Sequence, residues 1–194
     1  MVGSTVSWEA ETTFERNYAT PYRDGALFLE GDSSASWNEE ENFIANSALL
    51  EGGAIYVDLG SNASWRGSTI LSKNNVTYGG GGAILIADSS TVELRGETTF
   101  ESNACSSEGG AVSSKVLDSS TSTLSGNRES FLLITGSTTF SNNNCGSNGG
   151  GVALLSGLSA SFQSRNITFV GNEAGVAGGV FSSQQPVRGQ VSAI

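Results

Sequence analysis

The sequence predicts an all-β protein, a right-handed parallel β-helix solenoid of about six turns with three short strands in each turn. Three observations favour this fold. One short pattern recurs at a period of 28 to 29 residues, the segments between its copies are short and β-like, and no segment has the apolar spacing of a helix. A fixed period of this size is typical of a protein in which one unit stacks on the next.

The repeated pattern is a large apolar residue followed three positions later by asparagine. Glycine and small apolar residues come six to nine positions after the asparagine. The six copies are Phe14 with Asn17, Phe43 with Asn46, Leu71 with Asn74, Phe100 with Asn103, Phe140 with Asn143 and Phe169 with Asn172.

Each turn should hold one strand near a tryptophan position, a second through the phenylalanine position and a third after the glycines. Runs such as Thr5–Trp8 and Ala54–Val57 are rich in β-formers and are bounded by Gly, Ser, Asn and Asp. In a parallel solenoid, adjacent turns hydrogen-bond at roughly 4.8 Å. Equivalent residues would therefore lie in columns.

These columns explain the choice of residues. The phenylalanine positions should form an apolar column inside the coil, beside a second column made of Trp8, Trp37, Trp65, Leu94 and Ile134. The asparagines should lie at a corner, where Asn tolerates left-handed backbone and its amide can bond to the asparagine one turn away. The paired glycines should supply positive φ angles where the chain turns back.

Two motifs in a common phase connect the chain with a known family. Phe100-Glu101-Ser102-Asn103 and Gly109-Gly110-Ala111-Val112 resemble the FxxN and GGA[ILV] repeats of the chlamydial polymorphic outer membrane proteins. The turn with Phe43-Ile44-Ala45-Asn46 and Gly52-Gly53-Ala54-Ile55 matches both motifs as well. The remaining turns match in part, since Leu71 replaces Phe, Gly151 replaces Ala and only Gly25 is left of the first glycine pair. The resemblance implies a right-handed parallel β-helix of the pectin-lyase-like superfamily, located at the cell surface, and it implies architecture and location more than activity.

Composition agrees with an extracellular, cell-surface or organelle-lumen location. The chain has 19 acidic and 9 basic residues and a net charge of −10, so it lacks the basic face that nucleic acid requires. No stretch is long and apolar enough to span a membrane directly. Both ends lie in mid-pattern, so we expect residues 1–194 to be one repeat domain from a longer chain, with its ends covered by a protein partner or by self-association.

The two cysteines should stack on adjacent turns. Cys105 and Cys145 each lie two residues after an asparagine of the repeat, and stacked positions are close enough for a disulfide. A reducing compartment would instead favour two free thiols. Three sequons, at Asn62, Asn75 and Asn166, are glycosylation candidates if the source is eukaryotic.

The absence of histidine limits the reactions that the chain could catalyse, because it excludes the common histidine-activated nucleophiles and most zinc sites. We expect no catalytic residues and no cofactor, with calcium as an alternative at Asp32, Asp58 and Asp88. We expect these acids to form a column in the turn after the glycine strand and to face solvent. The segment 118–129 is predicted to leave the coil as an inserted loop, because the step from Phe100 to Phe140 is 40 residues.

The sequence therefore indicates a non-enzymatic structural, adhesive or scaffold solenoid that binds through its faces or its ends. The alternative is a β-helix that binds or degrades polysaccharide, with a glycan as partner. Such an enzyme would gather carboxylates in one groove, or place an arginine such as Arg66 or Arg95 beside an acidic cluster.

Overall fold

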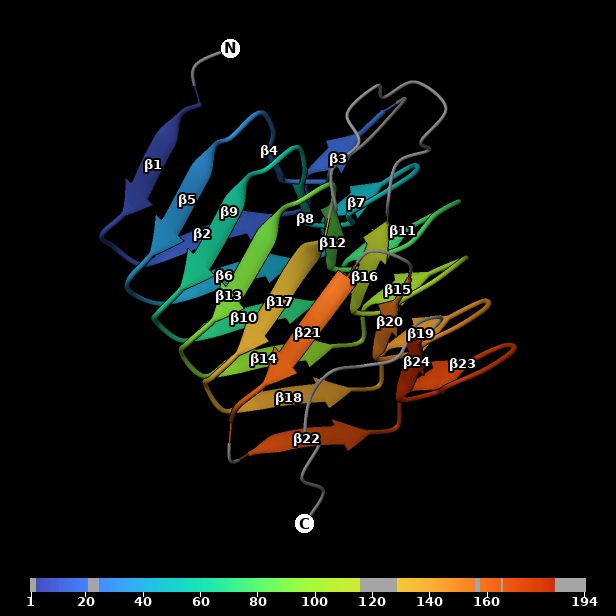
Figure 1. Cartoon of the computed structure of the whole chain (residues 1–194). Helices are drawn as coiled ribbons and strands as arrows, with labels where there is room; N and C mark the ends of the chain where they lie inside the picture. The colour runs from blue at the N-terminus through green and yellow to red at the C-terminus, as the bar shows by residue number, and fades with distance from the viewer. Residues whose placement is uncertain (1–2, 21–24, 116–128, 156–157, 165, 184–194) are drawn as a thin grey trace.

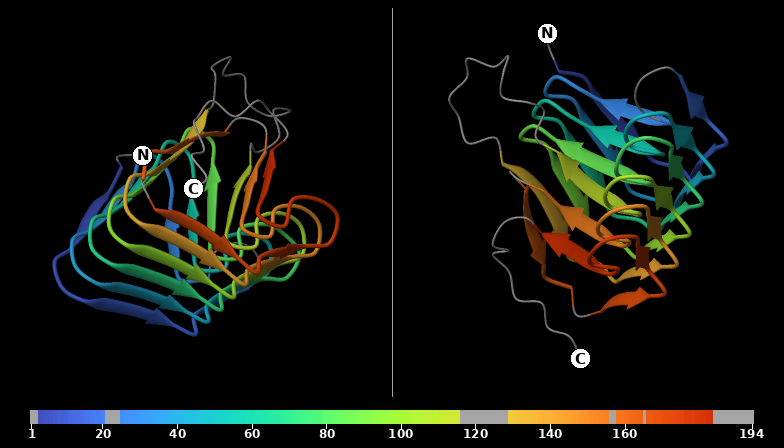
Figure 2. Two further views of the ribbon diagram at one scale, coloured as in Figure 1. Left: turned by 90° about the horizontal axis from the view of Figure 1, so that it is seen from below. Right: turned by 90° about the vertical axis from the view of Figure 1, so that its right-hand side faces the viewer.

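Four parallel sheets wind around a common core, as a computed structural model of residues 3–20, 25–115, 129–155, 158–164 and 166–183 describes. Each sheet has six strands, and each turn of the chain contributes one strand to every sheet (Figure 1). Successive turns lie over one another, and the loops near the shortest strands form a lobe on one side (Figure 2). The described residues contain strands and no helix, which confirms the predicted parallel β-solenoid.

Sheets A and B hold the strands on either side of the first corner. Sheet A consists of β1 (Thr5–Trp8), β5 (Ser34–Trp37), β9 (Asn62–Trp65), β13 (Thr91–Leu94), β17 (Ser130–Ile134) and β21 (Leu158–Phe162). Sheet B consists of β2 (Thr12–Glu15), β6 (Glu41–Ile44), β10 (Thr69–Ser72), β14 (Thr98–Glu101), β18 (Thr138–Ser141) and β22 (Ile167–Val170).

Sheets C and D complete each turn. Sheet C consists of β3 (Tyr18–Ala19), β7 (Ser47–Ala48), β11 (Asn75–Val76), β15 (Ala104–Cys105), β19 (Asn144–Cys145) and β23 (Glu173–Ala174). Sheet D consists of β4 (Leu27–Leu29), β8 (Ile55–Val57), β12 (Ile84–Ala87), β16 (Val112–Lys115), β20 (Val152–Leu154) and β24 (Phe181–Ser183).

The expected three strands per turn are corrected to four, because sheet C was not predicted. Its strands are two residues long and follow directly after the asparagine of each repeat. Such a short segment has no alternation of its own to recognise in a sequence. It becomes a strand because the turns above and below hold it in parallel register, as at Cys105 beside Cys145.

The register keeps equivalent residues in columns across the long 40-residue step. Leu94 pairs with Ile134 in sheet A, and Phe100 pairs with Phe140 in sheet B. The stack therefore continues in phase on both sides of the predicted insertion. Of that insertion only Glu129 lies within the described residues, where it is exposed.

The phenylalanine column forms the centre of the core. Phe43, Leu71, Phe100 and Phe140 have no exposed surface, and the rings of Phe100 and Phe140 stack with centroids 4.8 Å apart. The end members, Phe14 and Phe169, are partly buried and pack against the same core. In the second column, Trp37 and Trp65 are fully buried and stack at 4.5 Å. No single turn could bury these rings alone, so the core exists only through stacking.

The asparagine column is a continuous hydrogen-bonded ladder. The side-chain amide of Asn103 donates to the Oδ1 of Asn143 at 3.0 Å and to the carbonyl of Leu71 at 2.8 Å. Its own Oδ1 accepts from the backbone and side-chain nitrogens of Asn74, both at 3.0 Å. The pattern is the same for Asn46, Asn74 and Asn143, and Asn17 and Asn172 end the described ladder.

The left-handed residue at this corner is not the asparagine, which corrects one expectation. Positive φ occurs at the residue before it: Arg16, Ala45, Lys73, Ser102, Asn142 and Gly171. This backbone shape turns the next residue inward, and Asn is selected there for its four hydrogen bonds rather than for its backbone freedom.

The paired glycines have two different roles. The first of each pair has positive φ, as at Gly109, where φ is 71°. The second allows two turns to approach, since a Cβ on Gly110 would lie 2.1 Å from the carbonyl oxygen of Gly150. The first role follows from the predicted turn, and the second depends on the spacing of the stack.

One carboxylate is buried inside the coil. Glu41 has no exposed surface and stacks between Thr12 and Thr69 in a column that continues with Thr98 and Thr138. Within the described structure neither of its carboxylate oxygens has a hydrogen-bond partner. Burial raises the pKa of Glu41 from 4.5 to about 7, and the neighbouring charges of Glu39 and Glu40 add to the rise.

Glu41→Thr should stabilise the protein at neutral pH and weaken the pH dependence of its stability. The folded state holds the Glu41 proton more tightly than the unfolded state, so stability is full below pH 4.5 and falls as the pH rises to about 7. Allowing for solvent screening, we expect a loss of roughly 2 kcal/mol over this range in the parent. Denaturant unfolding at several pH values measures it, and an unchanged pH slope in Glu41→Thr would contradict the assignment.

Candidate functional site

The lobe beside sheet D is the place where the solenoid departs most from a smooth coil. In the second, third and fourth turns, the loop between sheet C and the paired glycines lies along the outer face of sheet D. The inner strands of that sheet are therefore covered on this face as well, and every residue of β8 and β12 is buried. Tyr56, Leu85 and Ala87 form a small apolar cluster under these loops, separate from the main core.

A cleft of about 320 Å³ opens in this lobe, and we call it the lateral cleft. It crosses several turns, since Leu50 and Glu51 come from the second, Tyr78 from the third and Glu108 and Lys115 from the fourth. Its described lining consists of Leu50, Glu51, Tyr78, Gly79, Gly80, Leu85, Ser107, Glu108, Ser113, Ser114, Lys115 and Leu155.

The cleft is open because side chains become small at this point. On the outer face of sheet D, Phe28 and Tyr56 stack at 5.2 Å in the first two turns. The register then places Leu85, Ser113 and Ala153 at the same position in the next turns. The covering loop of the third turn has two glycines, Gly79 and Gly80, where neighbouring loops carry side chains.

The polar groups of the cleft are held in place by one ion pair. The ammonium of Lys115, at the end of β16, contacts the carboxylate Oε1 of Glu51, which lies 64 residues earlier in the chain. The Glu51 side chain is 8% exposed and that of Lys115 is 47% exposed. Ser113 lies beneath them with 1% exposure. The pair fixes both charges against the cleft wall.

An exposed aromatic ring lies at the rim. Tyr78 is 70% exposed, and the neighbouring Leu50 is 36% exposed. The backbone nitrogen of Tyr78 donates to the carbonyl of Leu49 at 2.9 Å, so the loop that carries the ring is tied to the turn before it. The cleft therefore combines one aromatic face with hydroxyl, carboxylate and ammonium groups.

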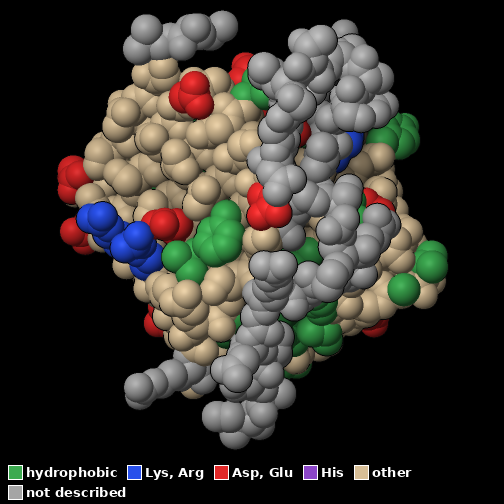
Figure 3. Space-filling model, viewed as in Figure 1, with side chains coloured by type: hydrophobic (Ala, Val, Ile, Leu, Met, Phe, Trp, Pro, Cys, Tyr) green, Lys and Arg blue, Asp and Glu red, His purple; other side chains and the backbone are tan. Residues whose placement is uncertain are grey.

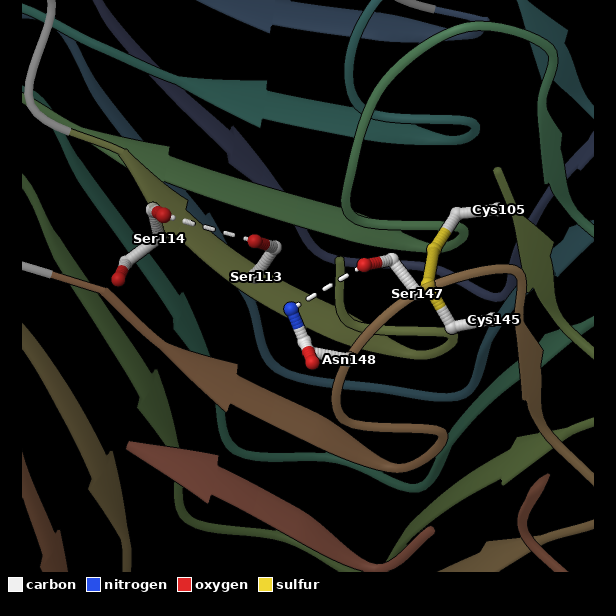
Figure 4. Close-up of a disulfide and its surroundings, with 6 residues drawn as sticks. All are labelled: Cys105, Ser113, Ser114, Cys145, Ser147 and Asn148. Atoms are coloured by element: carbon white, nitrogen blue, oxygen red, sulfur yellow. Dashed lines mark hydrogen bonds between the residues drawn. A yellow bond between two sulfur atoms is a disulfide. The ribbon is translucent and has the colours of Figure 1, made fainter. Parts of the chain in front are cut away.

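The predicted disulfide is present in the same lobe. Cys105 and Cys145 are linked, with their Cα atoms 4.8 Å apart, and they pack on Val76 (Figure 4). Cys105 precedes Ser107 of the cleft by two residues. The bridge ties the loops of two adjacent turns together, and the cleft is built from such loops.

The three candidate calcium ligands do not form a column. Paired strands on either side fix the alignment of this turn: Val57 faces Leu29 and Ile86, and Asn62 faces Ser34 and Thr91. Counting inward from these pairs, Asp32 aligns with Gly60, Asp58 with Glu30 and Asp88 with Leu59. The expected acidic column was therefore wrong, because its members come from three different positions in the turn.

Two of these aspartates also do not face solvent, contrary to expectation. Asp58 is 1% exposed and Asp88 is 4% exposed. The carboxylate of Asp58 accepts from the hydroxyl of Tyr56 at 2.9 Å and from the backbone nitrogen of Leu59 at 2.7 Å. Among the described residues, no group of three or more acidic or cysteine side chains could hold a metal ion. Calcium binding at Asp32, Asp58 and Asp88 stays a prediction.

The remaining candidate residues lie on the surface. The sequon asparagines Asn62, Asn75 and Asn166 are all exposed, and their glycosylation stays a prediction. The guanidinium of Arg95 donates to Glu93 through Nε at 2.9 Å. Arg66 and Arg95 follow paired strand ends and so lie on adjacent turns. The described part of the chain has no helix long and apolar enough to cross a membrane.

Sequence reasoning missed the lateral cleft and the buried Glu41. One signal for the cleft was present: the step from Asn74 to the positive-φ glycine Gly81 is one residue longer than the step from Asn103 to Gly109. The signal for Glu41 was its place two residues before Phe43, where most other turns have threonine.

Comparison with known proteins agrees with the repeat pattern. Residues 97–115 match the Chlamydia polymorphic membrane protein repeat. The chain is also 35% identical over 115 residues to a probable outer membrane protein, pmp8, of Chlamydia pneumoniae. That alignment covers 53% of this chain and 12% of the relative, so the chain corresponds to a small part of that protein. No solved structure matches the chain.

The matched segment contains Phe100-x-x-Asn103 and Gly109-Gly110-Ala111-Val112, the two motifs on which the resemblance was based. This confirms the predicted resemblance. The segment that matches the polymorphic membrane protein repeat, residues 97–115, lies within a parallel β-solenoid.

Proposed function

We propose that this chain is a non-enzymatic segment of a surface protein, a rigid solenoid that presents its lateral loops and long faces for adhesion. The observation that carries the proposal is the repeat itself. The same motifs that build the phenylalanine and asparagine columns match repeats of a membrane protein family, and the relative is named as an outer membrane protein.

The chemistry of the long faces supports binding more than catalysis. Sheet A presents mainly uncharged polar side chains and backbone, with acidic groups scattered over it (Figure 3). Its outer side chains form small ladders, as where the Ser36 hydroxyl donates to the Ser7 hydroxyl at 3.2 Å. Such a face offers many weak contacts of one kind, which suits adhesion through repeated units.

The lateral cleft also supports a binding role. The described carboxylates that line it are those of Glu51 and Glu108, and Glu51 is in an ion pair with Lys115. Glycoside hydrolysis requires two carboxyl groups that can both reach the bond to be cleaved. One of the two described carboxylates here is in contact with the Lys115 ammonium, an arrangement that suits binding more than cleavage.

Labelling of intact source cells tests the proposed location. A membrane-impermeant amine reagent should modify the exposed Lys73 before the cells are opened. Peptide mass spectrometry measures the labelled fraction, with an abundant cytoplasmic protein of the same cells as the negative control. Labelling of Lys73 only after lysis would place the chain inside the cell and would contradict the proposal.

A further inference from the structure

The long sides of the solenoid cannot recruit an extended peptide by adding it to a sheet. Strands of sheets C and D already pair with the turns above and below, as where the nitrogen of Ala104 in β15 donates to the carbonyl of Asn74 at 2.9 Å. Open strand edges occur only at the ends of a stack. A ligand in the lateral cleft must therefore be recognised by side chains and by the surface of the loops.

Those side chains match the chemistry of a sugar. A pyranose ring has an apolar face of C–H groups and an edge of hydroxyls that both donate and accept hydrogen bonds. In the cleft, the exposed ring of Tyr78 offers a flat apolar face, and Glu108 and Lys115, in the same lining, offer an acceptor and a donor. An exposed aromatic ring beside polar groups is an arrangement suited to a ligand with both characters.

Charge narrows the class of sugar. Among the described residues that line the cleft, Glu51 and Glu108 carry carboxylates and Lys115 carries an ammonium, which contacts Glu51. The whole chain carries a net charge of −10. An anionic sugar or a phosphate would be repelled both locally and at long range, so the ligand should be neutral.

The volume of the cleft limits the length of glycan that can bind. A volume of about 320 Å³ is at the low end of small-molecule sites, which run from roughly 300 to 1,000 Å³. The cleft accommodates one or two sugar rings rather than a long segment of polymer. A site of this size suits the end of a glycan chain.

We infer that the lateral cleft binds the terminal one or two rings of a neutral glycan, with the ring of Tyr78 stacked on a sugar face and Glu108 and Lys115 bonding to its hydroxyls. The inference deepens the proposed adhesive function and rests on it for its biological meaning. The binding itself is a property of the 194-residue chain and can be measured separately from its location.

Titration of the chain with neutral disaccharides tests the site, with lactose, cellobiose and N,N′-diacetylchitobiose as probes and digalacturonate as the charged comparison. We expect a roughly millimolar Kd for at least one neutral probe and weaker binding of digalacturonate. NMR or calorimetry measures both affinities. Tyr78→Ala should weaken the neutral probe roughly tenfold, because the stacking face is lost.

Two further variants make the result specific. Tyr18→Ala is the matched control, since Tyr18 is 65% exposed but does not line the cleft, and it should bind as the parent does. Glu108→Gln should narrow the gap between neutral and charged probes, since it removes one repelling charge. Because Tyr78 is exposed, Tyr78→Ala should melt as the parent does, which separates lost binding from lost folding.

Three results would overturn the inference: no neutral probe binds, Tyr78→Ala binds as well as the parent, or digalacturonate binds more tightly than every neutral probe. These failures are distinct from failure of the proposed location. If the chain binds sugar but Lys73 is labelled only after lysis, the surface role alone is contradicted. If Lys73 is labelled on intact cells but no sugar binds, the cleft assignment alone is contradicted.

Discussion

Asn103→Ala should lower the free energy of unfolding by about 4 kcal/mol or more, because it removes four hydrogen bonds from a fully buried ladder. The backbone and side-chain nitrogens of Asn74 would each lose a hydrogen bond inside the coil. The carbonyl of Leu71 and the Oδ1 of Asn143 would each lose one as well. Net contributions of about 1 kcal/mol per bond already reach this value, and unsatisfied buried groups add to it.

Asn75→Ala is the matched control, because Asn75 lies one residue beyond the ladder in the turn before and is exposed. It should change stability by no more than about 0.5 kcal/mol. Denaturant unfolding of the two variants beside the parent measures the difference. Equal stability of Asn103→Ala and Asn75→Ala would mean that the ladder does not hold the turns together.

Phe100→Ala should destabilise the protein by about 3–5 kcal/mol, the usual cost of removing a buried aromatic ring. Phe100 has no exposed surface, stacks on Phe140 and pairs in register with Leu71. The backbone spacing of the stack is fixed by hydrogen bonds, so neighbouring turns cannot close over the space left by the ring. Thermal and denaturant melts measure the loss.

The third turn provides the comparison for this variant. Leu71 occupies the phenylalanine position there and is also fully buried. Phe100→Leu should therefore cost much less than Phe100→Ala, on the order of 1 kcal/mol. If Phe100→Ala melted with the parent, the column would not be the core of the fold.

The fold was predictable because stacking imposes the same requirement on every turn. In the four inner turns a buried apolar side chain and a buried amide recur at the Phe and Asn positions, so the period in the sequence reports the period in space. Sheet C was missed since its two-residue strands depend on pairing between turns and have no pattern of their own. The alignment of Asp32, Asp58 and Asp88 was wrong because it was counted from the glycines, whereas the paired strands on both sides of the turn fix it.

The lateral cleft could not be predicted from spacing alone. It depends on which face of sheet D the loops cover, and on the place where the outer column changes from Tyr56 through Leu85 to Ser113. Glu41 could have been found by aligning turns, because threonine occupies its position in four of the other five copies. It directly follows Glu39 and Glu40 in the sequence, but the alternation of strand β6 turns its side chain inward.

The thiol state of Cys105 and Cys145 in labelled intact cells tests the central claim most directly, because it depends on both the stacking of turns and the compartment. Alkylation without reductant, followed by peptide mass spectrometry, should find the two cysteine peptides joined and neither thiol alkylated. That result is expected for adjacent stacked turns outside the reducing cytosol. Two alkylated thiols in native material would contradict the account of this chain as an extracytoplasmic surface solenoid.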